Sequence, residues 1–326
     1  MSKWRYVFGQ NRGTLIAFAL FVLMFAIYAS NHPAGFSANV VQTAANKGVL
    51  LALVAMAQTF VVITAGIDLS VGAVFVLTNC LASWIVVGTA WPAAFGVAGV
   101  LLTGLACGAL NGLVVIVGRL QPIVTTIATG AVFFGLALVL RPTPGGDVYG
   151  PLADALTGRA LGVLPASLLA LAAVVLVVWV PYRRSVIGRA AYAVGSSEQA
   201  AFMSGVPVDL AKFFAYVLSG LAASIGGLFL TFVTYSGEAS AANGGTYTLY
   251  SIAAVVLGGV SLYGGSGSAI GAIFGALMFR TIGDLLFVFN LDPLWQPLFQ
   301  GVVLLAAICV GAARLFQVRN RLELFE

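Results

Sequence analysis

Residues 93–117 read AAFGVAGVLLTGLACGALNGLVVIV, a stretch without any charged side chain. A helix needs about 20 apolar residues to cross a bilayer, so this stretch alone is long enough. Similar runs recur along the 326-residue chain, of which 61% is hydrophobic and 8% charged. A soluble domain carries about 25% charged residues, and so few polar groups could not cover a water-soluble fold of this size. The sequence therefore predicts an integral membrane protein.

Long continuous apolar runs favour transmembrane helices over a β-barrel, whose strands give short alternating segments. We expect an all-α polytopic protein in which residues 1–326 form a single transmembrane domain. Glycines four residues apart give two spans a flat stripe for close helix packing: Gly104, Gly108 and Gly112 on one, and Gly267, Gly271 and Gly275 on another. Ten spans are predicted, at residues 14–30, 48–66, 69–88, 93–117, 122–140, 164–182, 210–235, 248–263, 268–289 and 294–313.

Basic residues predict the orientation, because Lys and Arg concentrate in loops on the cytoplasmic side of a membrane. We therefore expect both termini and the loop 183–209 to be cytoplasmic. The Pro- and Gly-rich segment 141–163 is then periplasmic, with a short interfacial helix near residues 152–156. A net charge of +5 distributed in this way is a topology signal and gives no reason to expect nucleic acid. The residues concerned are Lys3, Arg5, Arg12, Arg183, Arg184, Arg189, Lys212, Arg314, Arg319 and Arg321.

Uncharged polar side chains lie inside several predicted spans. They would suit a neutral polyhydroxylated solute, but they are equally suited to hydrogen bonds between helices. Arg280 and Asp284 are four residues apart on one predicted helix, and we expect them to form an intrahelical or interfacial pair. The uncharged group comprises Gln58, Asn79, Thr103, Cys107, Asn111, Gln121, Thr125 and Thr129.

The segment Gly66–Gly72 reads GIDLSVG and places one carboxylate between two apolar stretches. This composition favours a helix break in which Asp68 or Ser70 caps the following helix. Two functional interpretations are open: a broken helix beside a translocation path, or a buried carboxylate coupled to ions. The simpler alternative is a tight cytoplasmic turn with a capping Asp.

Motifs for nucleotide, metal or covalent chemistry do not occur. The stretch Gly264–Ser268 is glycine-rich but lacks the lysine of a phosphate-binding loop. The only histidine, His32, has no nucleophile motif around it, and no ligand cluster with metal spacing is found. We therefore expect no catalytic residue, no metal site and no cofactor on this chain.

The cytoplasmic loop contains the segment GRAAYAVGSSEQAAFMSGVP at residues 188–207. Ser196 or Ser197 can cap a helix over about 197–204 that ends at Gly205. An ordinary solvated surface helix is the plain interpretation of this pattern.

Several motifs together resemble the inner-membrane permeases of ATP-binding-cassette (ABC) sugar importers, the ribose, xylose, arabinose and galactofuranose group. Besides the loop and GIDLSVG, they are Asn111-Gly112-Leu113 followed by Gln121-Pro122, LSGLAA at 218–223, and AVVLGGVSLYGGSGSAIGAIFG at 254–275. The resemblance covers about residues 40–313. It does not identify the sugar, because the segments 141–163 and 236–247 match no one specificity.

The resemblance implies the type II, vitamin-B12-importer-like permease fold in a multi-pass protein of the bacterial inner membrane. It also implies a second permease subunit, identical or related, a periplasmic sugar-binding protein, and a separate ATPase that uses ATP and Mg²⁺. Residues expected against the ATPase are Gly188, Gly195, Glu198, Ala200, Ala201 and Gly205. Residues expected near the sugar path are Gln58, Asp68, Ser70, Asn79, Asn111, Gln121 and Thr125.

A stand-alone secondary transporter or channel for a small polar solute is the rival hypothesis. It would need a coupling charge or an ion site inside the spans, and the sequence offers few. A membrane enzyme would need a catalytic constellation, which is missing from the sequence.

Overall fold

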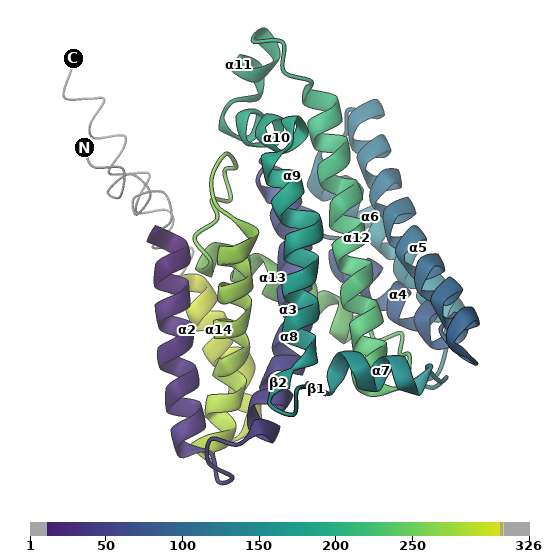
Figure 1. The fold of residues 1–326 in the computed structure, drawn as a ribbon. Coiled ribbons are helices and arrows are strands. Elements are labelled where there is room, and N and C mark those ends of the chain that lie inside the picture. The colour runs from purple at the N-terminus through teal and green to yellow at the C-terminus, as the bar shows by residue number, and fades with distance from the viewer. Residues whose placement is uncertain (1–11, 307–308, 310–326) are drawn as a thin grey trace, which may run out of the picture.

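Helices make up almost the whole of the computed structural model, which describes residues 12–306 and residue 309 (Figure 1). The basic residues Lys3, Arg5, Arg314, Arg319 and Arg321, and the end of the predicted span 294–313, lie outside this range. The first part of the chain forms α2 (Arg12–Asn31), α3 (Ala38–Val62), α4 (Val71–Ile85), α5 (Ala90–Val117) and α6 (Pro122–Leu140).

The middle of the chain holds the shorter elements. These are α7 (Gly150–Thr157), the two-stranded antiparallel hairpin β1 (Arg159–Ala160) and β2 (Leu164–Pro165), α8 (Ala166–Val174), the π-helical turn η1 (Val175–Trp179), α9 (Val180–Arg184), α10 (Val186–Ser196) and α11 (Glu198–Met203). The last part forms α12 (Val208–Thr234), α13 (Ala241–Leu257), α14 (Ala269–Val288), the 3-10 turn η2 (Pro293–Trp295) and a helix over Gln296–Ala306.

Seven helices of the described chain are long and apolar enough to cross a membrane. Three others are apolar but shorter: Val71–Ile85, Gly244–Leu257 and Gln296–Ala306. They occupy the places of the predicted spans 69–88, 248–263 and 294–313. The 15 residues of α4 rise only about 22 Å, which falls short of the roughly 30 Å of a hydrocarbon core.

The centre of the bundle is α3, whose residues from Val49 to Ile63 are almost all buried. Around it, α12 packs against α5 at very short range, because the predicted stripe of Gly104, Gly108 and Gly112 faces α12. A Cβ atom at Gly108 would overlap the backbone of α12 at Tyr216. The second stripe is partly wrong: Gly271 and Gly275 pack against α13, but Gly267 lies in the loop before α14 at φ +116°.

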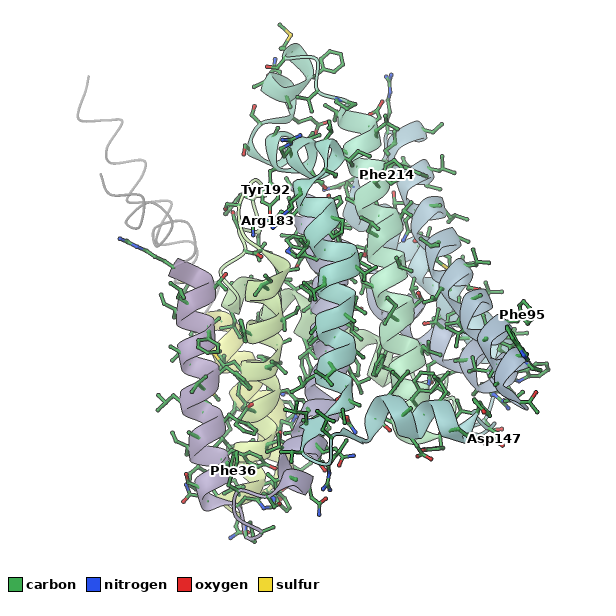
Figure 2. All side chains as sticks on the ribbon, viewed as in Figure 1. Phe36, Phe95, Asp147, Arg183, Tyr192 and Phe214 are labelled. Atoms are coloured by element: carbon green, nitrogen blue, oxygen red, sulfur yellow. The ribbon has the colours of Figure 1, made fainter. Side chains whose placement is uncertain are left out.

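The two hydrophilic segments predicted on opposite sides of the membrane lie at opposite ends of the bundle. Figure 1 shows α10 and α11 at the end where α2 begins, and α7 with the hairpin at the other end. In Figure 2, Tyr192 and Arg183 lie at the first end and Asp147 at the second. The short helix predicted near 152–156 is confirmed as α7.

Candidate functional site

The connection between α3 and α4 turns back into the bundle before α4 begins. Ala65 adopts the left-handed conformation at φ 63°, which lets the chain reverse after α3. The Leu69 N–H then donates to Thr126 Oγ1 of α6 at 2.9 Å. One turn further along α6, Gly130 leaves room for Ser70, since a Cβ there would lie 3.3 Å from Ser70 Cα. The N-terminal end of α4 is therefore inside the helix bundle.

Asp68 lies at this buried turn with only 2% of its surface exposed. Its Oδ1 accepts the Ser70 N–H (2.9 Å) and the Ser70 hydroxyl (2.6 Å), and its Oδ2 accepts the Ser219 hydroxyl of α12 (3.2 Å). Asn111 of α5 donates from Nδ2 to Ser70 Oγ at 2.7 Å. No Lys or Arg of the described chain forms an ion pair with Asp68. These bonds join the buried turn to α12 through Ser219 and to α5 through Asn111.

The capping role predicted for Asp68 or Ser70 is wrong. Ser70 stands at the N-cap position of α4, but its side chain accepts no N–H from the helix. Asp68 accepts the N–H two residues later, which is the pattern of an Asx turn. Its distant partner, Ser219, explains the difference, because the carboxylate is used to hold α12 as well as the local turn.

The N-terminal half of α13 meets the start of α4. The Gly72 N–H donates to Thr248 Oγ1 at 3.0 Å, and a Cβ at Gly72 would overlap the Gly244 carbonyl. The two short helices therefore touch near their N-terminal ends. Discontinuous helices of this kind form the substrate sites of many transporters.

The remaining predicted path residues divide into three groups. Asn79 is fully used: its amide donates to Thr231 Oγ1 and the Ser236 carbonyl and accepts the Glu238 N–H. The amide of Gln58 and the Thr125 hydroxyl are buried and have no hydrogen-bond partner. Asn111 Oδ1 is likewise buried without a partner. Gln121 is exposed at the N-cap of α6 and does not join the others.

Sequence reasoning did not identify Ser219, Thr126 or Thr248 as members of the polar network. Ser219 lies in the LSGLAA motif that carried the resemblance, so that motif was the signal available for it. Thr126 follows Thr125 on α6 and Thr248 lies two residues after Thr246 on α13, and nothing local singles out either one from its neighbouring threonine.

The predicted Arg280–Asp284 pair does not form a direct ion pair, although the Arg280 charge acts electrostatically on Asp284. Asp284 Oδ1 instead lies 3.9 Å from Lys47 Nζ on α3. Arg280 forms no ion pair or hydrogen bond with any residue the structure describes.

At the end of the bundle that carries α10 and α11, the loop helices are tied to the transmembrane part. Gly195 packs so closely on the Ile63 carbonyl and the Gly265 N–H that a Cβ would overlap them. The Gly265 N–H donates to the Ile63 carbonyl at 3.0 Å, and the Tyr192 hydroxyl donates to the Gly267 carbonyl at 2.7 Å. Burial raises the pKa of the Tyr192 phenol, and the nearby Arg183 partly offsets that rise. The phenol therefore remains a donor at neutral pH.

The predicted loop helix is confirmed as α11. Ser197 accepts the Ala200 N–H at 3.3 Å as its N-cap, and Gly205 follows at φ +74°. The preceding helix α10 was not predicted; Ser185 caps it by accepting the Gly188 N–H at 3.0 Å. Glu198 pairs with Lys212 of α12 at 2.6 Å.

Of the residues predicted to contact an ATPase, three face this chain itself. Gly188 packs on the Tyr182 carbonyl, Gly195 on Ile63, and Ala201 is only 6% exposed. Ala200 and Gly205 are exposed. Phe202 and Met203 of α11 are large apolar side chains that are 71% and 80% exposed.

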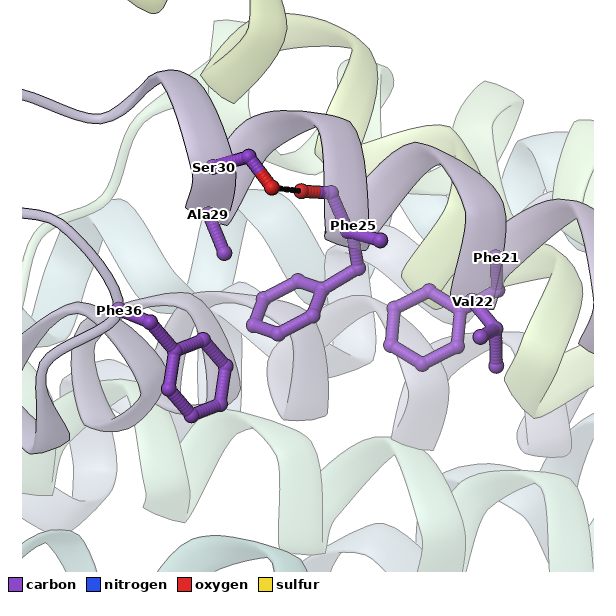
Figure 3. Close-up of a pocket in the computed structure, with 7 residues that line it drawn as sticks. Phe21, Val22, Phe25, Ala29, Ser30 and Phe36 are labelled. Atoms are coloured by element: carbon purple, nitrogen blue, oxygen red, sulfur yellow. Dashed lines mark hydrogen bonds between the residues drawn. The ribbon is translucent and has the colours of Figure 1, made fainter.

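A groove on α2 does not resemble a sugar site (Figure 3). Its walls are apolar, with Phe21, Phe25 and Phe36 as the largest side chains. Its one hydroxyl, Ser30, is bonded to the Ala26 carbonyl at 2.7 Å. Among the described residues, no group of three potential ligands could hold a metal ion.

A polytopic bundle with broken helices and a rigidly attached helical loop defines a membrane transport protein. Residues 40–308 match the family described as branched-chain amino acid transport system / permease component, and the chain belongs to this family. No significant match to a solved structure was found.

Curated relatives cover most of the chain. A probable ABC transporter permease protein, y4mJ, of Sinorhizobium fredii is 38% identical over 85% of this chain and 81% of its own. The ribose import permease protein RbsC of Bacillus subtilis is 37% identical over 78% of this chain and 79% of its own. The D-allose transport system permease protein AlsC of Escherichia coli is 30% identical over 93% and 92%.

Proposed function

We propose that this chain is the permease subunit of an ABC importer that carries a monosaccharide across the inner membrane. The family description names branched-chain amino acids, but relatives that match along most of the chain are named ribose and allose permeases. A stand-alone secondary transporter is disfavoured by the same relatives. ATP is hydrolysed by a partner subunit, and a periplasmic binding protein delivers the sugar.

The proposed mechanism depends on one contact. Gly195 of α10 packs directly against the carbonyl of Ile63, the first residue after α3. The chain runs from Ile63 to Asp68 without a helix between them. A force on α10 and α11 therefore acts on the turn that starts α4, and through Ser70 and Ser219 on α5 and α12. Nucleotide-driven closure of the ATPase would shift this buried turn and re-orient the helices around the path.

The path passes the polar residues at the start of α4 in this proposal. Asp68, Ser70, Asn111, Thr125 and Gln58 are its members, since they are buried polar groups and three of them hold unpartnered atoms. Asn79 and Gln121 are weaker members, because the first is fully bonded and the second is exposed.

The ten-span topology and the B12-importer-like fold belong to the same proposal. The three short apolar helices would complete ten crossings together with the seven long ones, and both termini would be cytoplasmic. Phe202 and Met203 would enter a groove of the ATPase. A second permease subunit would complete the pore.

The test reconstitutes the chain in liposomes with its partner ATPase and sugar-binding protein. Uptake of labelled D-ribose and D-allose is measured with ATP and with a non-hydrolysable analogue. ATP-dependent uptake of a monosaccharide supports the proposal. Uptake that proceeds without the ATPase would overturn it in favour of a stand-alone transporter.

A further inference from the structure

Arg280 occupies an unusual position near the middle of α14. A guanidinium has five N–H donors, and ionisable residues inside a membrane protein normally pair with another group. The one carboxylate nearby, Asp284, lies 3.9 Å from Lys47 instead. Arg280 has no hydrogen bond or ion pair with any residue the structure describes. The charges of Lys47 and Arg280 both act on Asp284, so two cations share one carboxylate in this region.

Tyrosines from α13 lie beside Arg280. The Tyr250 ring packs edge-on against Phe279, the neighbour of Arg280, with centroids 4.9 Å apart. Tyr247 lies one turn before Tyr250 on α13, and the Arg280 charge acts electrostatically on both phenols. Neither hydroxyl forms a hydrogen bond with a described residue, so both can bind a ligand.

The helix Gln296–Ala306 brings an unpartnered amide to the same level. Gly283 of α14 packs against Gln296, since a Cβ there would lie 2.9 Å from Gln296 Cδ. Gln300 follows Gln296 by about one turn, and Phe279 and Arg280 precede Gly283 by about one turn on α14. Since the chain reverses between the two helices to make the Gly283–Gln296 contact, we place Gln300 toward Phe279 and Arg280. Gln300 is only 1% exposed, yet neither atom of its amide has a partner.

We infer that Arg280, Gln300 and the two tyrosines form a binding subsite for a monosaccharide that carries a carboxylate, that is, a sugar acid. The planar guanidinium matches a carboxylate in a two-bond arrangement, and the charge of the ligand would balance the excess cation. The phenols and the amide would bind hydroxyl groups. A neutral sugar would leave Asp284 as the one nearby carboxylate for two cations, Lys47 and Arg280. As a site on the transport route, the subsite rests on the proposed function.

The test measures equilibrium binding of labelled D-gluconate and D-ribose to the purified full-length chain in lipid nanodiscs. The wild type should bind D-gluconate more tightly than D-ribose. Arg280→Gln should weaken D-gluconate binding about tenfold or more, as loss of a charge-assisted bond predicts, and Arg280→Lys less. Arg119→Gln, which removes an exposed guanidinium at the end of α5, is the matched control and should bind as the wild type does.

Three results would overturn this inference: D-gluconate binding no tighter than D-ribose, binding that Arg280→Gln leaves unchanged, or an Arg280 dependence seen only for D-ribose. If the Arg280→Gln variant does not fold, Gln300→Leu is tested instead. It replaces the buried amide by an apolar side chain of similar size and should weaken D-gluconate binding several-fold. Unchanged D-gluconate binding by Gln300→Leu would then count against the subsite. A separate measurement tests the proposed function: ATP-dependent uptake of D-ribose or D-allose by the full complex. If that uptake is seen, the proposed function holds even when the subsite is refuted. If no monosaccharide is taken up in an ATP-dependent way, the proposed function itself is overturned.

Discussion

Replacing Asp68 by leucine tests whether the buried turn depends on its carboxylate. Three donors end on Asp68: the Ser70 N–H, the Ser70 hydroxyl and the Ser219 hydroxyl. Ser70 and Ser219 are fully buried, so water would not replace the lost acceptor. An unsatisfied buried donor costs about 1–3 kcal/mol, so Asp68→Leu should lower the free energy of unfolding by at least about 3 kcal/mol.

Asp68→Asn is the matched control, because the amide keeps one acceptor oxygen for Ser70. The Ser219 hydroxyl can rotate to accept from the new NH₂ group. No buried donor is then left unpaired, so Asp68→Asn should lower the free energy of unfolding by only about 1 kcal/mol. Unfolding in mixed micelles with increasing SDS measures both values, and ATP-driven uptake in liposomes reports on function. If the leucine and asparagine variants unfold at the same SDS fraction, the carboxylate does not hold this turn.

Three further changes have outcomes that follow from the geometry. Gly72→Ala places a methyl group against the Gly244 carbonyl and should destabilise the bundle by about 1–3 kcal/mol in the same SDS assay; wild-type stability would show that α4 and α13 are not in close contact. The double variant Phe202→Ala, Met203→Ala removes two exposed apolar side chains and should reduce co-purification of the ATPase while leaving the SDS midpoint unchanged; full retention of the ATPase would exclude this surface from docking. Ser196→Cys, in a variant without native cysteines, should resist an impermeant thiol reagent in intact cells; rapid labelling from outside would reverse the proposed orientation.

Local signals in the sequence predicted the helices and several of their ends correctly. The helix α11 followed from Ser197 and Gly205, and close packing of another helix on α5 followed from the Gly104 stripe, although the stripe did not identify α12 as that helix. These features depend on residues a few positions apart. The approximate places of all ten apolar segments also followed from hydropathy, although three of them are too short to meet the length criterion for a span.

Features that depend on distant residues could not be predicted in this way. Spacing allowed Arg280 to pair with Asp284, but Lys47, on another helix, is the observed partner. The residues around Asp68 suggested a helix cap. In the structure, Ser219 of α12 donates to the Asp68 carboxylate, which therefore connects α12 to the turn before α4. Hydropathy also gives no depth, so the apolar run of α4 does not show that α4 begins inside the bundle. The GIDLSVG segment indicated a helix break there but left a tight cytoplasmic turn as an alternative.

The polar residues at the start of α4 are explained by the need to satisfy its backbone. A helix that begins inside a membrane protein exposes N–H groups that water cannot reach, and each would be costly if unpaired. The N–H groups of Leu69, Ser70 and Gly72 are taken by Thr126, Asp68 and Thr248, respectively. All three acceptors are side chains, two of them on other helices, so a helix shift can break or remake these bonds without unwinding a long helix. The same arrangement that makes the broken helix stable therefore gives it the exchangeable contacts that alternating access requires.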